Sequence, residues 1–376
     1  MKSLSHSRRR LRAMFRKESL QILRDPSSVA IAFVLPFCLL LLFGYGVTLD
    51  AKHIHLALVV EQPDTTTSGL VNAFMLSDYF EPSSYSNIQT AERALQEHKV
   101  DGVVWLRNDF SARVMSGGTA PIGVFVNGVD ANKARITQGY IEGVWFVWLA
   151  SYARERGLQI KAPVALEPRI WFNAAVSSRS FLVPGLIAII MTLTGAMLTS
   201  MVVAREWERG TMEALMVTPI RIWEITVGKL LPYFVLGMGG MFLSVVLALF
   251  LFNVPLRGSL WVLSAVSALY MVVALGMGML ISTVARSQFV AGQVALVATF
   301  LPSFILSGFL FQIGSMPDVV QGITHIVPAR YFVAILQTVF MVGDIWPVLL
   351  SNSAALLLMA VFFLAIARRK SRKRLD

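Results

Sequence analysis

The sequence predicts a mainly α-helical polytopic membrane protein with six transmembrane helices and one small extracytoplasmic α/β domain. Three observations support this fold class. Of the 376 residues, 56% are apolar and 15% are charged, and the mean hydropathy of +0.65 is typical of membrane proteins. Six apolar stretches are long enough to cross the hydrocarbon core, which takes about 20 residues. Positive charge is concentrated at the two ends of the chain.

The charge distribution predicts the orientation of the chain. Residues 1–28 contain eight Lys and Arg against two acidic residues, and residues 368–376 contain six against one. Basic segments beside membrane helices stay in the cytoplasm, so both termini, including the basic tail 368–376, are expected there. No nucleic-acid partner is expected, because such a groove needs a structured basic face with interleaved aromatic residues.

The first transmembrane helix is expected at residues 29–47, and the other five are expected within residues 181–367. Their predicted ranges are 182–204, 225–252, 260–285, 289–311 and 346–367. Pro36 interrupts the first helix, which a membrane helix tolerates where neighbouring groups satisfy the freed carbonyl. A cleaved signal peptide is the alternative for this segment, but the apolar run is long for one and no clear cleavage site follows. Residues 312–342 are apolar but rich in Gly and Pro, so a re-entrant loop is one option for them.

Residues 48–180 are predicted to form the external α/β domain. Strand patterns occur at 54–60, 100–106 and 122–127, and helix patterns occur at 88–99 and 130–156. Twelve Lys and Arg against thirteen acidic residues give no positive-inside bias, as a long translocated domain permits. We interpret Trp145, Phe146 and Trp148 as core or membrane-interface residues rather than as a ligand cage.

Residues 1–28 are predicted to form an amphipathic helix in the cytoplasmic interface. Leu11, Met14, Phe15 and Ile22 fall at helical spacing among basic residues, and the pattern ends at Pro26. The alternative is an ordinary solvated basic tail.

No pattern of a catalytic or metal site is present in the sequence. The five histidines lack metal-ligand spacing, and His53 with His55 is interpreted as a solvated pair. Gly228 and Lys229 do not belong to a phosphate loop, because Trp223 stands where its first glycine would be. We therefore expect neither enzymatic activity nor a cofactor on this chain.

The segment 204–220 reads AREWERGTMEALMVTPI and lies between the second and third predicted spans. Its charged side chains are Arg205, Glu206, Glu208, Arg209 and Glu213. Its apolar side chains are Met212, Leu215, Met216 and Val217, before a break at Thr218 and Pro219. The pattern predicts a cytoplasmic amphipathic helix that docks on another protein. A structural loop with helical ion pairs is the alternative.

Residues 171–220, which include this segment, resemble the permease subunits of type-2 ABC exporters. The likeness is to bacterial multidrug-efflux-like members that have a large periplasmic domain after the first helix. It rests on WFN at 171–173, SRSFLVPGLIAII at 178–190 and the ERG-T-x-E-x-L-x-x-T-P-I pattern at 208–220. The resemblance implies a bacterial inner-membrane location, a periplasmic domain at 48–180, a cytoplasmic ABC ATPase dimer that binds ATP and Mg²⁺, and a second permease chain, identical or paralogous. It also allows a periplasmic adaptor protein.

The resemblance further implies that 204–220 is the coupling helix that receives force from the ATPase. The implied coupling residues, none of them catalytic, are Glu206, Glu208, Arg209, Gly210, Thr211, Glu213, Leu215, Thr218 and Pro219. Apart from Lys229, the predicted spans carry almost no ionisable residues, which suits export of an amphiphilic or drug-like compound or a lipid. A membrane-anchored receptor or sensor is the alternative function. A secondary transporter is a third reading, but it would need intramembrane charges or paired broken helices.

Overall fold

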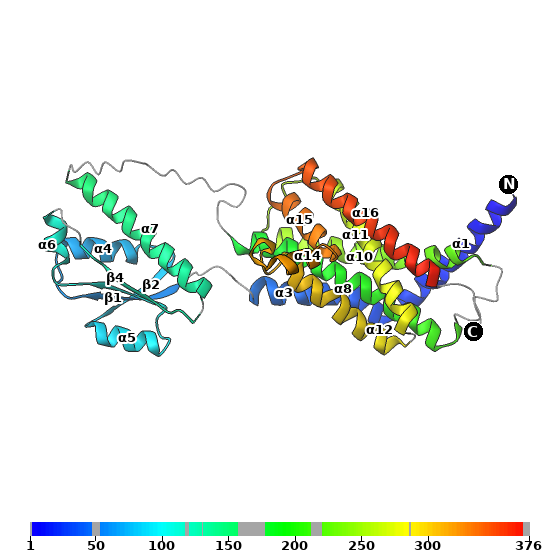
Figure 1. Cartoon of the computed structure of the whole chain (residues 1–376), viewed down its shortest axis with the longest axis horizontal. Helices are drawn as coiled ribbons and strands as arrows, with labels where there is room; N and C mark the ends of the chain where they lie inside the picture. The colour runs from blue at the N-terminus through cyan, green and yellow to red at the C-terminus, as the bar shows by residue number, and fades with distance from the viewer. Residues whose placement is uncertain are drawn as a thin grey trace. The chain divides into compact units, whose positions relative to one another are not determined.

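The computed structural model describes residues 2–46, 53–116, 120–129, 131–156, 177–211, 220–285 and 287–370. The chain divides into two compact units. One combines Met1–Thr48 with Ile170–Asp376 and is a bundle of helices, and the other, Leu49–Arg169, is a small α/β fold (Figure 1).

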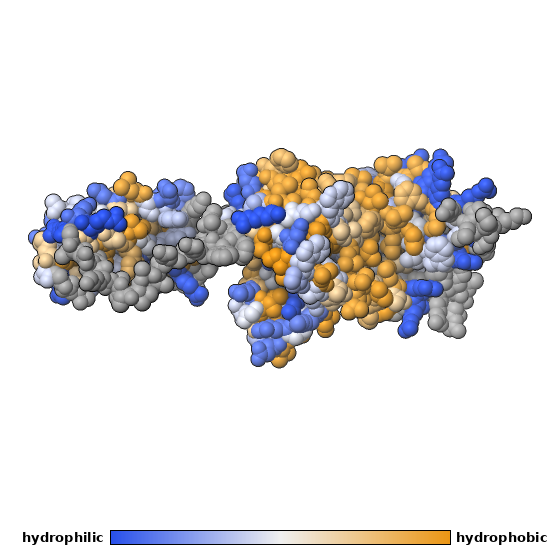
Figure 2. All heavy atoms as spheres, turned by 90° about the horizontal axis from the view of Figure 1, so that it is seen from above, coloured by the Kyte–Doolittle hydropathy of each residue, from blue (hydrophilic) through white to orange (hydrophobic). Residues whose placement is uncertain are grey.

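Within the described ranges, six helices of the helical unit are long and apolar enough to cross a membrane, which confirms the predicted number of spans. They cover Pro26–Gly46, Ser178–Glu208 (α8), Trp223–Phe250 (within α10, Ile222–Phe250), Leu260–Ala285 (α11), Gln288–Leu306 and Trp346–Arg369 (within α16, Trp346–Lys370). The most apolar stretch of α8 is 89% buried, against 17% for the last span, so α8 forms the centre of the bundle. The outer helices turn apolar side chains outward. Figure 2 shows a broad hydrophobic surface on the helical unit, with hydrophilic residues toward its ends.

Two of the spans are interrupted for the same reason. The first consists of α2 (Pro26–Val29), a π-helical turn at Ala30–Val34 and α3 (Leu35–Gly46). The fifth consists of α12 (Gln288–Ala295), a π-helical turn at Leu296–Phe300 and α13 (Leu301–Leu306). Each wide turn precedes a proline, Pro36 or Pro302, whose ring would clash with the carbonyl four residues earlier in a regular helix.

Between the fifth and sixth spans lie the turn Ile313–Ser315 and two helices, α14 (Asp318–Thr324) and α15 (Pro328–Met341). The two helices bend by 84° at the break between them, which fits a re-entrant hairpin or a broken span. Helix α15 is tied into the bundle, because Phe332 is fully buried and its ring stacks on Tyr270 of α11 at 4.0 Å between centroids.

The α/β unit is a four-stranded sheet with helices on both faces. Its strands are β1 (Ile54–Val60), β2 (Phe80–Tyr85), β3 (Gly102–Leu106) and β4 (Gly123–Val126), in the order β2-β1-β3-β4. The first three strands are parallel, and β4 is antiparallel to β3. Its helices are α4 (Thr65–Met75), α5 (Ile88–Gln96), α6 (Phe110–Met115) and α7 (Ala131–Glu155). Helices α4 and α7 cover one face of the sheet and α5 covers the other (Figure 1). An apolar core lies under α4 and α7, and a separate one lies under α5.

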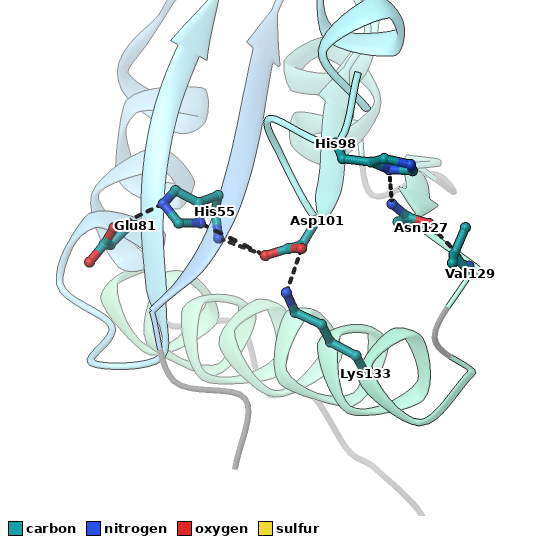
Figure 3. Close-up of polar contacts among 7 residues, drawn as sticks. All are labelled: His55, Glu81, His98, Asp101, Asn127, Val129 and Lys133. Atoms are coloured by element: carbon teal, nitrogen blue, oxygen red, sulfur yellow. Dashed lines mark hydrogen bonds and ion pairs between the residues drawn. The ribbon is translucent and has the colours of Figure 1, made fainter. Parts of the chain in front are cut away.

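A polar cluster lies where β1 and β3 begin (Figure 3). Asp101 accepts a hydrogen bond from Lys133 Nζ of α7 at 2.6 Å, and the backbone N–H of His55 lies 3.3 Å from the same carboxylate. His53 and His55 both contact Glu81, at 2.9 and 3.3 Å, and both imidazoles are more than half exposed. The two histidines are therefore the solvated pair that the sequence predicts, and Lys133 fastens α7 to the sheet.

Candidate functional site

The N-terminal helix packs along the third span. Helix α1 (Lys2–Leu23) is amphipathic as expected, and its apolar residues Met14 and Ile22 are buried. Met14 lies over Gly228 of α10, where an added Cβ would come within 2.7 Å of its side chain. The glycine therefore lets α1 approach α10 closely, so part of the apolar face of α1 is covered by protein. Figure 1 shows α1 and the C-terminal end of α16 at the same end of the helical unit.

Asp25 joins the start of the first span to the end of α8. As the N-cap of α2, it accepts hydrogen bonds from the Ser27 backbone N–H and the Ser28 hydroxyl. Arg205 donates to Asp25 from Nη1 at 2.8 Å and to Gln288 from Nε at 3.0 Å. Burial alone would raise the pKa of Asp25, but the hydrogen bonds from Ser27, Ser28 and Arg205 outweigh burial and lower that pKa to about 2. Asp25 is therefore ionised and paired at any physiological pH.

Glu206 is the point where three helices meet. Its side chain forms ion pairs with Lys17 of α1, at 2.7 Å, and with Lys229 of α10. Glu206 is only 3% exposed and Lys229 only 2%. Lys17 also contacts Glu18, which is fully buried, at 3.1 Å. Because a charge in such a place is costly unless it is paired, these contacts fix the ends of α1, α8 and α10 against one another.

A second group of contacts between α1 and α10 involves Glu224, in the first turn of α10. Its carboxylate accepts hydrogen bonds from the Ser7 hydroxyl at 2.6 Å and the Arg221 backbone N–H at 3.0 Å. Arg10 lies 3.8 Å from the same carboxylate. Glu224 is not among the residues predicted from the sequence, although its place three residues after Arg221 is that of the acidic residue in a helix-capping box.

The structure describes only part of the expected coupling helix 204–220, since residues 212–219 lie outside the described residues. Helix α8 continues to Glu208, so Arg205, Glu206 and Glu208 belong to the end of the second span. The helix ends because Gly210 adopts φ +69°, a left-handed conformation that glycine takes without strain.

The predicted coupling residues fall into three groups. Glu206 is buried and holds helices together, so it is not itself an exposed docking residue. The exposed residues at the end of α8 are Glu208, Arg209, Gly210 and Thr211. Glu213, Leu215, Thr218 and Pro219 lie outside the described residues. Two contacts order the exposed group: Glu208 accepts a hydrogen bond from the Gln288 backbone N–H at 3.0 Å, and the Thr211 hydroxyl donates to the Glu206 carbonyl at 3.2 Å.

In the described ranges, no group of three or more His, Cys, Asp and Glu residues is placed to hold a metal ion. The ion pairs join the end of α8, the helix at the centre of the bundle, to α1, to α10 and to Asp25 at the start of the first span. We call Asp25, Lys17, Arg205, Glu206, Glu224, Lys229 and Gln288 the junction.

Comparison with known proteins identifies the family. The sequence profile of the ABC-2 family transporter protein matches residues 27–369. The Escherichia coli K12 protein named "Probable multidrug ABC transporter permease YbhS" is 44% identical over 98% of both chains. The protein named "Probable multidrug ABC transporter permease YbhR", from the same strain, is 27% identical to this chain over 90% of this chain and 94% of its own length. The "Inner membrane transport permease YhhJ" of the same strain is 28% identical over 76% of this chain and 77% of its own.

These matches confirm the family that the residues at 171–220 predict. They point to a transporter component rather than an enzyme or a receptor, and membership implies an ATPase partner and pairing of permease chains. The chain is a multi-pass membrane protein that belongs to the ABC-2 family of transporter permeases.

Proposed function

We propose that this chain is the permease of an exporter that moves amphiphilic or drug-like compounds or lipids outward across a bacterial inner membrane. A separate cytoplasmic ATPase dimer supplies the energy, and both termini of the permease are cytoplasmic. The names of the relatives YbhS and YbhR support a multidrug cargo, and that of YhhJ supports the inner membrane. The basic ends of the chain support the orientation.

The observation that carries this proposal is the exposed end of α8, fixed by the junction. Helix α8 has 31 residues. At 1.5 Å per residue it is about 46 Å long, well beyond a hydrocarbon core of roughly 30 Å. Its end therefore extends past the membrane while its middle is the most buried part of the bundle. A push on residues 208–211 is transmitted along a continuous helix to the centre of the permease.

The N-terminal helix supports the same mechanism. Because α1 is bonded to Glu206 of α8 and to Glu224 of α10, a displacement of the α8 end moves α1 and α10 with it. We expect α1 and residues 208–211 to form one surface for the ATPase. This surface joins the second and third spans into a single moving part.

The distribution of charge supports an amphiphilic cargo. In the described spans, the Asp, Glu, Lys and Arg residues lie near helix ends, as Arg179, Glu206 and Lys229 do. Three complete spans, Pro26–Gly46, Leu260–Ala285 and Gln288–Leu306, contain none of these residues. Such helices offer no fixed ion site and no proton relay to a hydrophilic cargo. A second permease chain, identical or paralogous, would enclose the rest of the path, and a periplasmic adaptor is a further partner to look for.

The test is purification of the tagged full chain from native membranes in mild detergent, with identification of co-purifying proteins and an ATPase assay. We expect a stoichiometric ABC ATPase that is lost with the double exchange Glu208→Lys and Glu213→Lys. The matched control reverses the same number of charges in the α/β unit, at the exposed Asp78 and Glu92. Retention of the ATPase by the control and its loss from the test variant support the proposal. A chain that purifies alone and inactive would contradict it.

A further inference from the structure

A long groove lies between α4 and α7 of the α/β unit. Its volume is about 800 Å³, within the range of sites that bind small organic molecules. The α7 side is lined by pairs of adjacent residues that recur every four positions and therefore lie on one face of the helix. These pairs are 139 and 140, 143 and 144, 147 and 148, 151 and 152, and 155 and 156. The α4 side is lined by Thr65, Thr66, Gly69, Asn72, Ala73 and Leu76.

Two glycines keep the α7 side of the groove open. Gly139 and Gly143 are one turn apart, and a Cβ added at either would meet nothing within 4 Å. Glycine inside a helix costs about 1 kcal/mol relative to alanine. Close packing between the described residues does not require a glycine at position 139 or 143. Gly69 differs, because a Cβ there would lie 3.1 Å from the Trp148 indole nitrogen. The two missing side chains leave room for a ligand over α7.

Aromatic rings line the groove along its length. Tyr79 stacks on Tyr140 with 4.3 Å between ring centroids, and Trp148 stacks on Tyr152 at 5.3 Å. The polar lining is mostly uncharged hydroxyl and amide groups, with one carboxylate, that of Glu155, and one guanidinium, that of Arg156, at the same end of the groove. The Glu155 carboxylate is exposed, whereas the guanidinium of Arg156 lies over the Tyr152 ring at 4.8 Å from its centroid. Aromatic faces and a carboxylate both attract an organic cation.

The dimensions of the groove define the shape of its ligand. From residue 139 to residue 156 the helix rises about 26 Å, so a volume of about 800 Å³ corresponds to a mean cross-section of about 30 Å². A ligand that fills this groove along its length is therefore long and narrow. We propose that this groove binds an elongated aromatic amphiphile with a cationic end. Its part in export, as a site for cargo, rests on the function proposed above.

Binding of rhodamine 6G, an aromatic amphiphilic cation, tests this proposal on the full chain in lipid nanodiscs. Fluorescence anisotropy is measured against empty nanodiscs, so that partition of the dye into lipid is subtracted. The double exchange Gly139→Leu and Gly143→Leu places two side chains in the groove from Cβ positions that meet nothing within 4 Å, and should raise the Kd at least tenfold. Gly128→Leu, at an equally open glycine outside the groove, is the matched control and should leave the Kd within twofold. Glu155→Gln should raise it about threefold, as expected for an exposed ion pair.

Circular dichroism and thermal unfolding establish that each variant is folded. Unchanged dye binding in the folded double variant would overturn the proposal, as would equal weakening by Gly128→Leu. Unchanged binding after Glu155→Gln would overturn the assignment of a cationic end. The assay needs no ATPase, so a failure here with ATP-driven transport intact rejects the groove and leaves the exporter standing. Specific binding without any ATP-driven transport supports the groove and rejects the exporter.

Discussion

Exchange of Glu206 for glutamine removes the carboxylate that pairs with two lysines at the centre of the junction. The two lysines differ in burial: Lys229 is 2% exposed, whereas the side chain of Lys17 is 46% exposed. Removing one partner of a buried pair costs about 3 to 5 kcal/mol, because the other charge stays in a poor environment. An exposed pair contributes less than about 1 kcal/mol. The cost of Glu206→Gln should therefore come almost entirely from its pair with Lys229.

A double-mutant cycle isolates this contribution. We expect Glu206→Gln and Lys229→Met each to lower the free energy of unfolding by about 3 kcal/mol, and the double variant to lower it by about 3 kcal/mol as well. The coupling energy between the two side chains is then about 3 kcal/mol. Lys17→Met is the matched control and should cost less than about 1 kcal/mol, although it removes an ion pair with the same carboxylate.

The assay is reversible unfolding of the purified chain in mixed micelles titrated with sodium dodecyl sulfate, followed by circular dichroism. Additive losses, with a coupling energy below about 0.5 kcal/mol, would refute the reasoning. So would a larger cost for Lys17→Met than for Lys229→Met, since burial would then not determine the strength of the pair.

Three further predictions concern single positions. Gly210→Ala forces a side chain into φ +69° and should cost about 1 kcal/mol; an unchanged thermal midpoint would contradict this. Asp25→Asn should lower the midpoint at pH 7. The pKa of Asp25 is lowered to about 2 from its usual 3.8, so its contribution is present above pH 3.8 and is lost as the pH falls toward 2. The difference from the parent protein should shrink across that window, and a constant difference would argue against the Arg205 pair. Gly139→Ala and Gly143→Ala should each stabilise the protein by about 1 kcal/mol, whereas a lower midpoint would mean that α7 is packed at these glycines.

The spans and the central strand were predictable because burial alone determines them. Each span is an apolar run of about 20 residues, and β1 reads IHLALVV, a buried strand between two neighbours. Strand β2 was missed because it is an edge strand, FEPSSY, with Pro82 and two serines and no apolar alternation. Helix α4 was missed as well, since its threonine-rich start hides a capping box between Asp64 and Thr67.

The junction was only half predictable. The charged motif after the second span drew attention to Arg205 and Glu206, but their partners Asp25 and Lys17 lie 180 and 189 positions away in the sequence. Such pairs depend on how α1 and α8 pack, and the local periodicity of the sequence does not predict contacts between segments that are far apart in the chain. Helix α8 ends just before Gly210, where the sequence alone leaves two options, because a glycine in a helical pattern signals either an interruption or a cap.

The central claim is that ATP hydrolysed on a partner drives outward movement of an amphiphile through the exposed end of α8. Uptake of rhodamine 6G into inverted membrane vesicles measures this most directly, because the cytoplasmic face is then outside and accessible to ATP. We predict ATP-dependent uptake that Glu208→Lys with Glu213→Lys abolishes and that Asp78→Lys with Glu92→Lys preserves. Uptake that persists in the first variant, or that needs no ATP, would contradict the account.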